Sequence, residues 1–173
     1  MKLFSPNLHH KTYKEIDFNR LKERGINTLF FDVDNTLVPH DCAYPDDILK
    51  DEITRLKTSG FQIFVISNNK EERVKAFADQ LDLKYYAFAL KPTKLTYRKI
   101  IKENQLDQSK IAIIGDQLLT DVLGGNRMGL FTIYTTPLVS RDINFTKINR
   151  LFEKQIIIWL KKHHKLDEGV IYE

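Results

Sequence analysis

The predicted fold is built around one strand and the residues that follow it, Thr28-Leu29-Phe30-Phe31-Asp32-Val33-Asp34-Asn35-Thr36. The first half of this stretch is an apolar run of the kind found in strands that are buried on both faces of a sheet. Side chains alternate between the two faces of a strand, so Asp32 and Asp34 point the same way. Two carboxylates this close repel each other unless a cation or a shared proton compensates them. The stretch therefore predicts a buried strand that ends in a charged functional site.

The sequence on either side of this strand repeats the pattern. Between residues 28 and 135, short β-rich apolar runs alternate with segments of helical periodicity, which is typical of βαβ units and a mostly parallel sheet. The five expected strands are Thr28–Val33, Phe61–Ser67, Lys84–Ala89, Ile111–Gly115 and Phe131–Thr135. The helices expected between them cover about 45–60, 74–81, 93–104 and 118–129. We predict an α/β, Rossmann-like three-layer sandwich with a mostly parallel five-stranded sheet.

Length and composition favour one domain. The chain has 173 residues, 42% of them hydrophobic, which is enough for a single core. Residues 1–27 are expected to form a lead-in with a short helix near 17–23, and 28–135 the catalytic core. With one cysteine, no apolar leader and no apolar run long enough to cross a bilayer, we expect a cytoplasmic protein without a transmembrane segment.

Polar residues lie where four of the expected strands end. They are Asp32 to Thr36 at the end of the first, Ser67-Asn68-Asn69 at the end of the second, Lys91 after the third, and Asp116 with Asp121 at and beyond the end of the fourth. In a parallel α/β sheet the carboxyl ends of the strands meet at one edge, where ligands bind. Oxygen ligands without a neighbouring His or Cys favour Mg²⁺ over zinc. The sequence thus predicts a magnesium-dependent site at this edge.

These four motifs, in this order, resemble those of the haloacid dehalogenase-like (HAD) phosphohydrolases. The resemblance implies that Asp32 is a nucleophile that forms an aspartyl-phosphate. It implies that Asp34 protonates the leaving alcohol and then activates water, a role that favours phosphate-ester hydrolysis. Ser67 and Lys91 would hold the transferring phosphoryl oxygens.

The same resemblance implies a metal site. Its Mg²⁺ ligands would be carboxylates and one backbone carbonyl, drawn from Asp32, Asp34, Asp116 and Asp121. Asp121 could instead orient Lys91, or simply begin a helix. Ser67 could cap the following helix, and Lys91 could be a surface lysine. The candidate substrate-binding residues are Thr36, Asn68 and Arg127, although Asn68 could shape its loop and Arg127 could be a plain surface residue.

The spacing of the motifs leaves little room for a cap domain. Asp34 and Ser67 are 33 positions apart and Ser67 and Lys91 are 24, and each interval is filled by one helix and one strand. The resemblance therefore implies a cap-less, open site. Such a site suits a macromolecule, a partner protein or a lipid in a membrane surface.

A narrower resemblance covers nearly the whole chain. The sequences around the motifs, including residues 32–39, 89–92 and 115–127, look like those of the YqeG family, a subclass IIIA family similar to mitochondrial phosphatidylglycerophosphate phosphatases. This implies an anionic phospholipid substrate and a peripheral position on the inner face of a membrane. A phosphatase of nucleic-acid ends or soluble metabolites, and a non-enzymatic module in ribosome assembly, are the alternatives. Nucleic acid is a less favoured partner, and the oligomeric state is open.

The charge of the chain is concentrated near its C-terminus. Seven of the 27 Lys and Arg residues, but only two of the 23 acidic residues, fall within 141–165, where a basic amphipathic helix is expected. Such a helix could rest on an anionic bilayer. It could also pack its apolar stripe on the domain and leave a solvated basic face, as most amphipathic helices do. We favour the packed arrangement.

Overall fold

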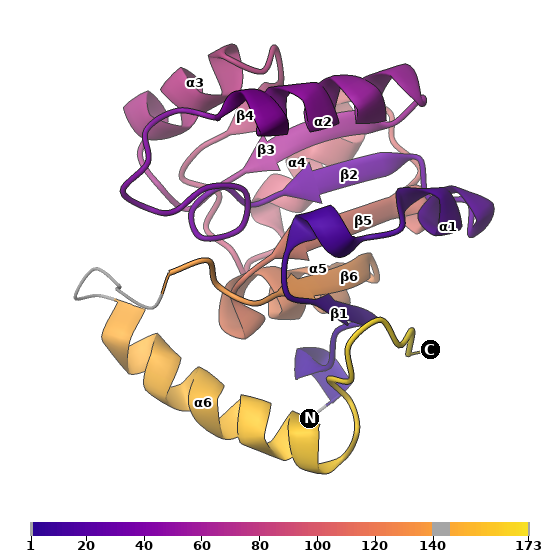
Figure 1. Ribbon diagram of the computed structural model, residues 1–173, viewed down its shortest axis with the longest axis vertical. Helices are drawn as coiled ribbons and strands as arrows, with labels where there is room; N and C mark the ends of the chain where they lie inside the picture. The colour runs from indigo at the N-terminus through magenta and orange to yellow at the C-terminus, as the bar shows by residue number, and fades with distance from the viewer. Residues whose placement is uncertain (1, 140–145, 173) are drawn as a thin grey trace.

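Six parallel strands form the sheet at the centre of the computed structural model, which describes residues 2–139 and 146–172, without the side chains of 146–151. The strand order is β1-β6-β5-β2-β3-β4, and every neighbouring pair is parallel (Figure 1). The bounds are β1 Leu8–His10, β2 Thr28–Phe31, β3 Gln62–Ile66, β4 Lys84–Tyr86, β5 Ile111–Gly115 and β6 Phe131–Thr135. β2 lies between β3 and β5, so the chain after it emerges near the middle of the sheet.

The predicted number of five strands is wrong by one. The additional strand is β1, which lies in the expected lead-in and pairs with β6, with Leu8 opposite Ile133. It has three residues, two of them histidines, which is too short and too polar for the pattern that predicts a strand. The expected strand Lys84–Ala89 also ends earlier, at Tyr86, because the chain then turns away from the sheet.

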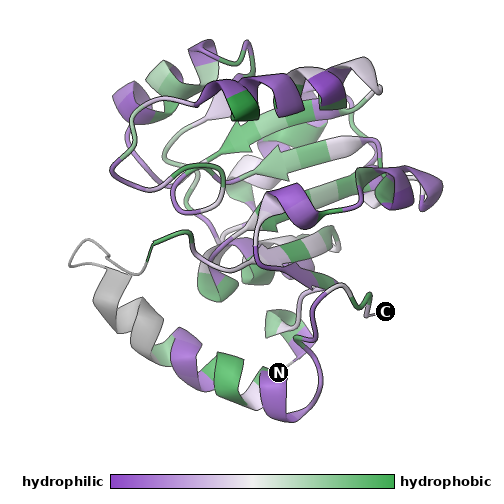
Figure 2. Cartoon of the chain, in the orientation of Figure 1, coloured by the Kyte–Doolittle hydropathy of each residue, from purple (hydrophilic) through white to green (hydrophobic). Residues whose placement is uncertain are grey.

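Helices cover both faces of the sheet, so the three-layer prediction is confirmed. Three helices lie on one face, α1 Phe18–Glu23, α2 Asp47–Thr58 and α3 Glu71–Asp79, and two on the other, α4 Leu95–Glu103 and α5 Leu123–Met128. β2 explains this arrangement, because Phe31 packs among the first group and Phe30 among the second. Both rings are fully buried, which contributes about 1.5–3 kcal/mol each. Figure 2 shows hydrophobic residues concentrated on the strands.

Local side-chain chemistry fixes where helices begin and how closely they pack. α2 starts two residues after the expected Pro45, because Asp46 caps it by accepting a hydrogen bond from Leu49 N at 2.8 Å. α5 approaches the sheet at Gly125, where an added Cβ would lie 2.5 Å from side-chain carbons of Ile113 and Thr132. Only a residue without a side chain fits there. A π-helical turn, Leu118–Val122, leads into α5.

The C-terminal helix α6, Thr146–Lys162, packs on the domain. Leu160 is fully buried, and Ile156 and Trp159 are partly buried against a cluster that includes Leu118 and Tyr134. The structure thus agrees with the packed arrangement; Arg141, at the start of the expected helix, lies outside the described residues. No helix in the described part of the chain is long and apolar enough to cross a membrane.

Candidate active site

A buried lysine joins two carboxylates at the carboxyl end of β2. Lys91 Nζ donates a hydrogen bond to Asp32 Oδ1 at 2.6 Å and another to Asp121 Oδ1 at 2.6 Å. None of these three side chains is more than 8% exposed. Because so little water screens them, these ion pairs are stronger than pairs at the surface. The structure therefore brings together three residues from three separate segments of the chain, which the sequence predicted to share one site.

Burial and neighbouring charge shift the titration of this pair. Burial raises the pKa of Asp32, and the adjacent Lys91 ammonium opposes that shift only in part. For Lys91, burial alone would lower the pKa, but the carboxylates of Asp121 and Asp32 outweigh burial and hold it above its ordinary value. Lys91 is therefore a permanent cation at neutral pH.

A third buried carboxylate completes an acidic cluster. Oxygen atoms of Asp32, Asp116 and Asp121 all lie within 4.8 Å of one another, and all three residues are buried. Thr36 Oγ1 donates to Asp116 Oδ1 at 3.5 Å. Three buried carboxylates carry more negative charge than the one ammonium of Lys91 compensates, and hard oxygen donors suit a divalent cation. The residues present thus fit a metal ion.

The position of Asp121 depends on a glycine and on its own helical turn. A Cβ at Gly115 would lie 2.2 Å from Asp121 Cγ, so the end of β5 must be glycine for Asp121 to fit. Asp121 Oδ2 accepts hydrogen bonds from Gln117 N at 3.2 Å and Thr120 Oγ1 at 3.3 Å. Asp121 therefore both stabilises the start of a helical turn and holds Lys91, which combines two readings that the sequence left as alternatives.

Asp34 is held by two residues that sequence reasoning did not select. Arg73 Nη2 donates to Asp34 Oδ1 at 2.8 Å, and Asn69 Nδ2 donates to Asp34 Oδ2 at 3.0 Å. Asn69 belongs to a polar cluster that the sequence did reveal. Arg73 lies within the charged helix α3, where nothing in the residue pattern distinguishes it from other surface arginines. The sequence pattern gives only its position in the first turn of α3, a helix that begins at the carboxyl edge of the sheet.

The remaining expected residues support the loops around the site. Asn68 uses its side-chain amide to bind the Lys91 backbone, with Lys91 N donating to Oδ1 at 2.8 Å and Nδ2 donating to Lys91 O at 3.0 Å. Ser67 is buried, and its Oγ accepts a hydrogen bond from Asn69 N at 3.1 Å. Arg127 is exposed, and its Nη1 donates to Pro92 O at 3.2 Å, beside Lys91.

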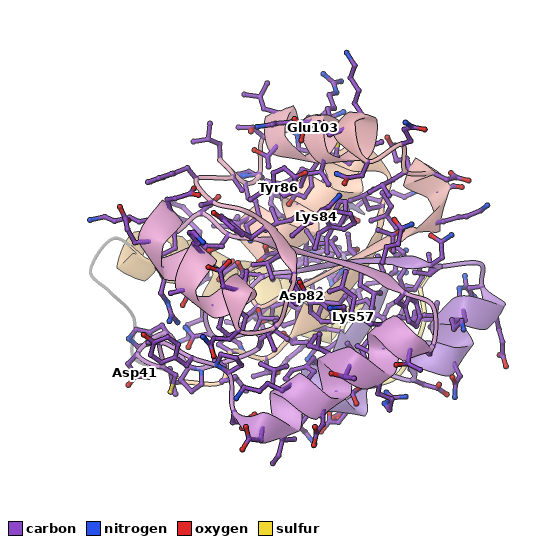
Figure 3. All side chains as sticks on the ribbon, turned by 90° about the horizontal axis from the view of Figure 1, so that it is seen from above. Asp41, Lys57, Asp82, Lys84, Tyr86 and Glu103 are labelled. Carbon is purple, nitrogen blue, oxygen red and sulfur yellow. The ribbon has the colours of Figure 1, made fainter. Side chains whose placement is uncertain are left out.

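A surface hollow of about 470 Å³ lies elsewhere. Its lining includes Lys57, Asp82, Lys84 and Glu103, at the amino ends of β3 and β4. Figure 3 shows these residues away from Asp41, which belongs to the loop between β2 and α2 at the carboxyl edge. Asp32 therefore does not lie in this hollow, and the candidate active-site residues lie at the opposite edge of the sheet.

Comparisons with known proteins place phosphatases among the relatives of this chain. A family model described as "Mitochondrial PGP phosphatase" matches residues 1–140. The chain is 37% identical over 161 residues to "Probable phosphatase YqeG" of Bacillus subtilis (strain 168), covering 93% of this chain and 94% of that protein. It is 29% identical over 170 residues to phosphatidylglycerophosphate phosphatase 1, chloroplastic/mitochondrial, of Arabidopsis thaliana, covering 91% of this chain but only 48% of that longer protein.

Solved structures share the fold. An uncharacterized protein from Listeria monocytogenes serotype 4b matches with a TM-score of 0.54 and 18% identity, over 68% of this chain and 85% of that one. A "putative HAD superfamily (subfamily III A) hydrolase" from Legionella pneumophila matches with a TM-score of 0.50 and 23% identity, over 72% of this chain and 75% of that one.

The fold, the acidic edge and the named relatives together define an α/β phosphatase. Its fold is shared by the HAD-superfamily structure from Legionella pneumophila. Within that class, the chain belongs to the family that the matching model describes as mitochondrial PGP phosphatase. The resemblance expected from the sequence, the α/β fold and the enzyme class are thereby confirmed.

Proposed function

We propose that this phosphatase hydrolyses phosphate monoesters through a covalent phosphoryl intermediate on Asp32. The proposal rests mainly on the different environments of Asp32 and Asp34. These two aspartates follow β2 two positions apart, and each has its own cationic partner. Asp32 contacts Lys91, and Asp34 contacts Arg73. Two carboxylates in different environments suit two different roles, one as nucleophile and one in proton transfer.

The proposed reaction has two steps. In the first, an oxygen of the Asp32 carboxylate attacks phosphorus, the bond from phosphorus to the ester oxygen breaks, and Asp34 gives a proton to the leaving alkoxide. In the second, water attacks phosphorus and gives its proton to Asp34, while the bond from phosphorus to Asp32 breaks. Inorganic phosphate leaves and both aspartates return to their starting states. Lys91 and Ser67 stabilise the charge on the phosphoryl oxygens.

Mg²⁺ is the proposed cofactor. Asp32, Asp116 and Asp121, with the backbone carbonyl of Asp34, would hold it, and when bound it would neutralise negative charge on the transferring phosphoryl group. The acidic cluster supports this choice, because hard carboxylate oxygens in a buried site match Mg²⁺ better than zinc.

We propose phosphatidylglycerophosphate as the substrate. The description of the matching family and the name of the Arabidopsis relative support it. The position of Asp32 at an edge of the sheet, away from the hollow described above, suits a substrate that stays in a membrane surface. Arg127, exposed beside the loop of Lys91, is the proposed contact for the anionic headgroup. A peripheral position at the inner face of a membrane follows from this substrate.

Phosphate release tests the function. Wild type and Asp32→Asn are compared on phosphatidylglycerophosphate in mixed micelles, on soluble sugar phosphates and nucleotides, and on 5′-phosphorylated oligonucleotides, each with Mg²⁺ or with chelator. We expect release from the lipid, lost on substitution and on chelation. Preference for a soluble ester or a nucleic-acid end would keep the chemistry and overturn the substrate. No release from any of them by folded wild type would contradict the phosphatase and favour a binding role.

A further inference from the structure

The loop between β4 and α4 turns large apolar side chains into solvent beside the active site. Phe88 and Leu90 are 57% and 58% exposed, while Ala89 between them and Lys91 after them are buried. Leu95, the first residue of α4, is 64% exposed. We call Phe88, Leu90 and Leu95 the apolar rim. Because the rim follows the carboxyl end of β4, it lies at the same edge of the sheet as Asp32 (Figure 1).

The backbone at the rim is one that large side chains rarely adopt. Phe88 has φ 45° and Leu90 has φ 54°, in the left-handed region that favours Gly and Asn. Hydrogen bonds from Phe88 N to Asn69 O and from Ala89 N to Ser67 O, both at 3.0 Å, fix this path. This backbone conformation directs Ala89 and Lys91 toward the interior. It does not require Phe88 and Leu90, since Asn or Gly would fit a positive φ better and would be better solvated.

Basic residues lie close to the rim along the chain. Lys94 and Arg98 lie one turn apart on the same side of the start of α4. Lys70 follows Asn69, whose carbonyl binds the rim backbone. None of these three cations makes an ion pair with any residue that the structure describes. With Arg127 they outnumber the acidic residues that follow Lys70, Glu71 and Glu72, of which Glu71 accepts a hydrogen bond from Tyr85. Exposed apolar side chains among cations are the combination that binds an anionic bilayer.

A second exposed apolar pair at this edge has the opposite surroundings. Tyr44 and Ile48 are 62% and 63% exposed, but they lie in sequence among Asp41, Asp46 and Asp47. Anionic lipid would be repelled there, so exposure alone does not make a membrane-binding surface. This pair is as exposed as the rim and also carries large apolar side chains, so it provides a control for the surrounding charge.

We propose that the apolar rim inserts into the surface of an anionic lipid bilayer while Lys70, Lys94 and Arg98 contact the headgroups. This proposal rests on the proposed function. Docking would hold the edge of the sheet that carries Asp32 against the membrane, where the phosphate of a lipid substrate is presented. The rim therefore takes the role that the sequence offered as an alternative for the C-terminal helix. That helix packs Ile156, Trp159 and Leu160 on the domain, although it leaves Phe152 and Ile158 exposed.

Vesicle co-sedimentation tests the proposal. Wild type is compared with the double variant Phe88→Asn/Leu90→Asn on vesicles of phosphatidylglycerol mixed with phosphatidylcholine, and on phosphatidylcholine alone. We expect wild type to bind the anionic vesicles, less at high salt, and the double variant to bind them about tenfold more weakly. Since Asn suits a positive φ, the variant should fold, and its unfolding midpoint should not fall below that of wild type.

Two matched comparisons sharpen the result. Tyr44→Asn/Ile48→Asn should bind as wild type does. Arg98→Gln should bind about fivefold more weakly, whereas Lys102→Gln, one turn farther along α4 and also exposed, should not. The proposal is overturned if wild type binds no anionic vesicle, or if the folded rim variant binds as well as wild type.

The outcome is separable from that of the proposed function. Vesicle binding needs neither substrate nor turnover, so it is also measured with Asp32→Asn. Failure of the phosphatase chemistry appears as absent phosphate release with vesicle binding intact. Failure of the docking surface appears as lost dependence on the rim in a protein that still releases phosphate.

Discussion

Arg73 and Asp34 form an ion pair across the mouth of the site, with Arg73 Nη2 2.8 Å from Asp34 Oδ1. Asn69 holds the other oxygen of the same carboxylate at 3.0 Å. The Asp34 and Arg73 side chains are each about four-fifths buried, at 20% and 18% exposure. Both oxygens of Asp34 are thus fixed in direction before a substrate arrives. A group that must give a proton to one partner and take it from another depends on such orientation.

Replacing Arg73 should therefore slow turnover without unfolding the protein. We expect Arg73→Gln to lower the rate of phosphate release by about 10- to 100-fold, because Asp34 is no longer held in direction. Arg55→Gln is the control, since Arg55 makes a similar pair with Glu52 on α2 at 2.6 Å but more than half of its side chain is exposed. Equal rates for the two variants would show that the Arg73 pair has no part in the reaction.

Lys91 should be a structural as well as a functional residue. Lys91→Met leaves Asp32 and Asp121 buried without their cation, which should lower the free energy of unfolding by about 3–5 kcal/mol in the absence of divalent ions. Added Mg²⁺ should raise the unfolding midpoint of this variant more than that of wild type, because it compensates the same carboxylates.

The control for Lys91 is Lys57→Met. Lys57 pairs with Asp82, whose side chain is fully exposed, and its Nζ also donates to the exposed Asp82 carbonyl at 2.8 Å. Its loss should therefore cost about 1 kcal/mol, well below the cost expected for Lys91. Thermal unfolding with and without Mg²⁺ measures both variants. Equal losses of stability in the two variants, or no effect of Mg²⁺ on Lys91→Met, would contradict the account of the acidic cluster.

Glu153 should link the C-terminal helix to the acidic cluster. It is 4% exposed, and its Oε1 accepts a hydrogen bond from Leu119 N at 2.9 Å, in the turn between Asp116 and Asp121. Glu153→Ala leaves the partly buried N–H of Leu119 without this acceptor, which should cost about 1 kcal/mol and weaken Mg²⁺ binding. Glu153→Gln keeps an acceptor and should recover most of both losses. Calorimetric titration with Mg²⁺ and unfolding experiments measure both variants. An unchanged Mg²⁺ affinity in Glu153→Ala would show that Glu153 does not connect the helix to the acidic cluster.

His9 should make stability depend on pH. Burial lowers its pKa below the ordinary value of 6.5, with smaller contributions from His10 and Lys161, while the Leu166 carbonyl and Glu168 oppose the shift. The unfolded chain thus binds a proton more readily than the folded chain. The contribution of neutral His9 to the free energy of unfolding is complete above about pH 6.5 and is lost as the pH falls below that value. Denaturant unfolding between pH 5 and 7.5 should show a steeper loss for wild type than for His9→Gln, and parallel curves would contradict this role.

The central strands and the main site residues could be predicted because their signals are local. A run such as Thr28 to Phe31 can be recognised without its neighbours, and parallel topology then brings the ends of β2, β4 and β5 to one edge. The three-residue strand β1 could not be predicted, since it is defined by pairing with β6 far along the chain.

The missed site residues have a common cause. Arg73 and Glu153 reach the site through long side chains from helices, and their partners Asp34 and Leu119 are 39 and 34 positions away. No spacing rule joins such pairs. The exposure of Phe88 and Leu90 could not be predicted either, because apolar side chains are expected to be buried. The structure shows both exposed, on a backbone with positive φ angles.

The covalent mechanism is tested most directly by looking for the phosphoryl group on Asp32 during turnover. Protein mixed with Mg²⁺ and phosphatidylglycerophosphate micelles is quenched in acid within milliseconds to seconds, digested and weighed by mass spectrometry. We predict one phosphoryl group on the peptide that contains Asp32, none in Asp32→Asn, and phosphate release by that variant reduced by about 1,000-fold or more. Continued release at the wild-type rate by Asp32→Asn, with no modified peptide in wild type, would contradict the account.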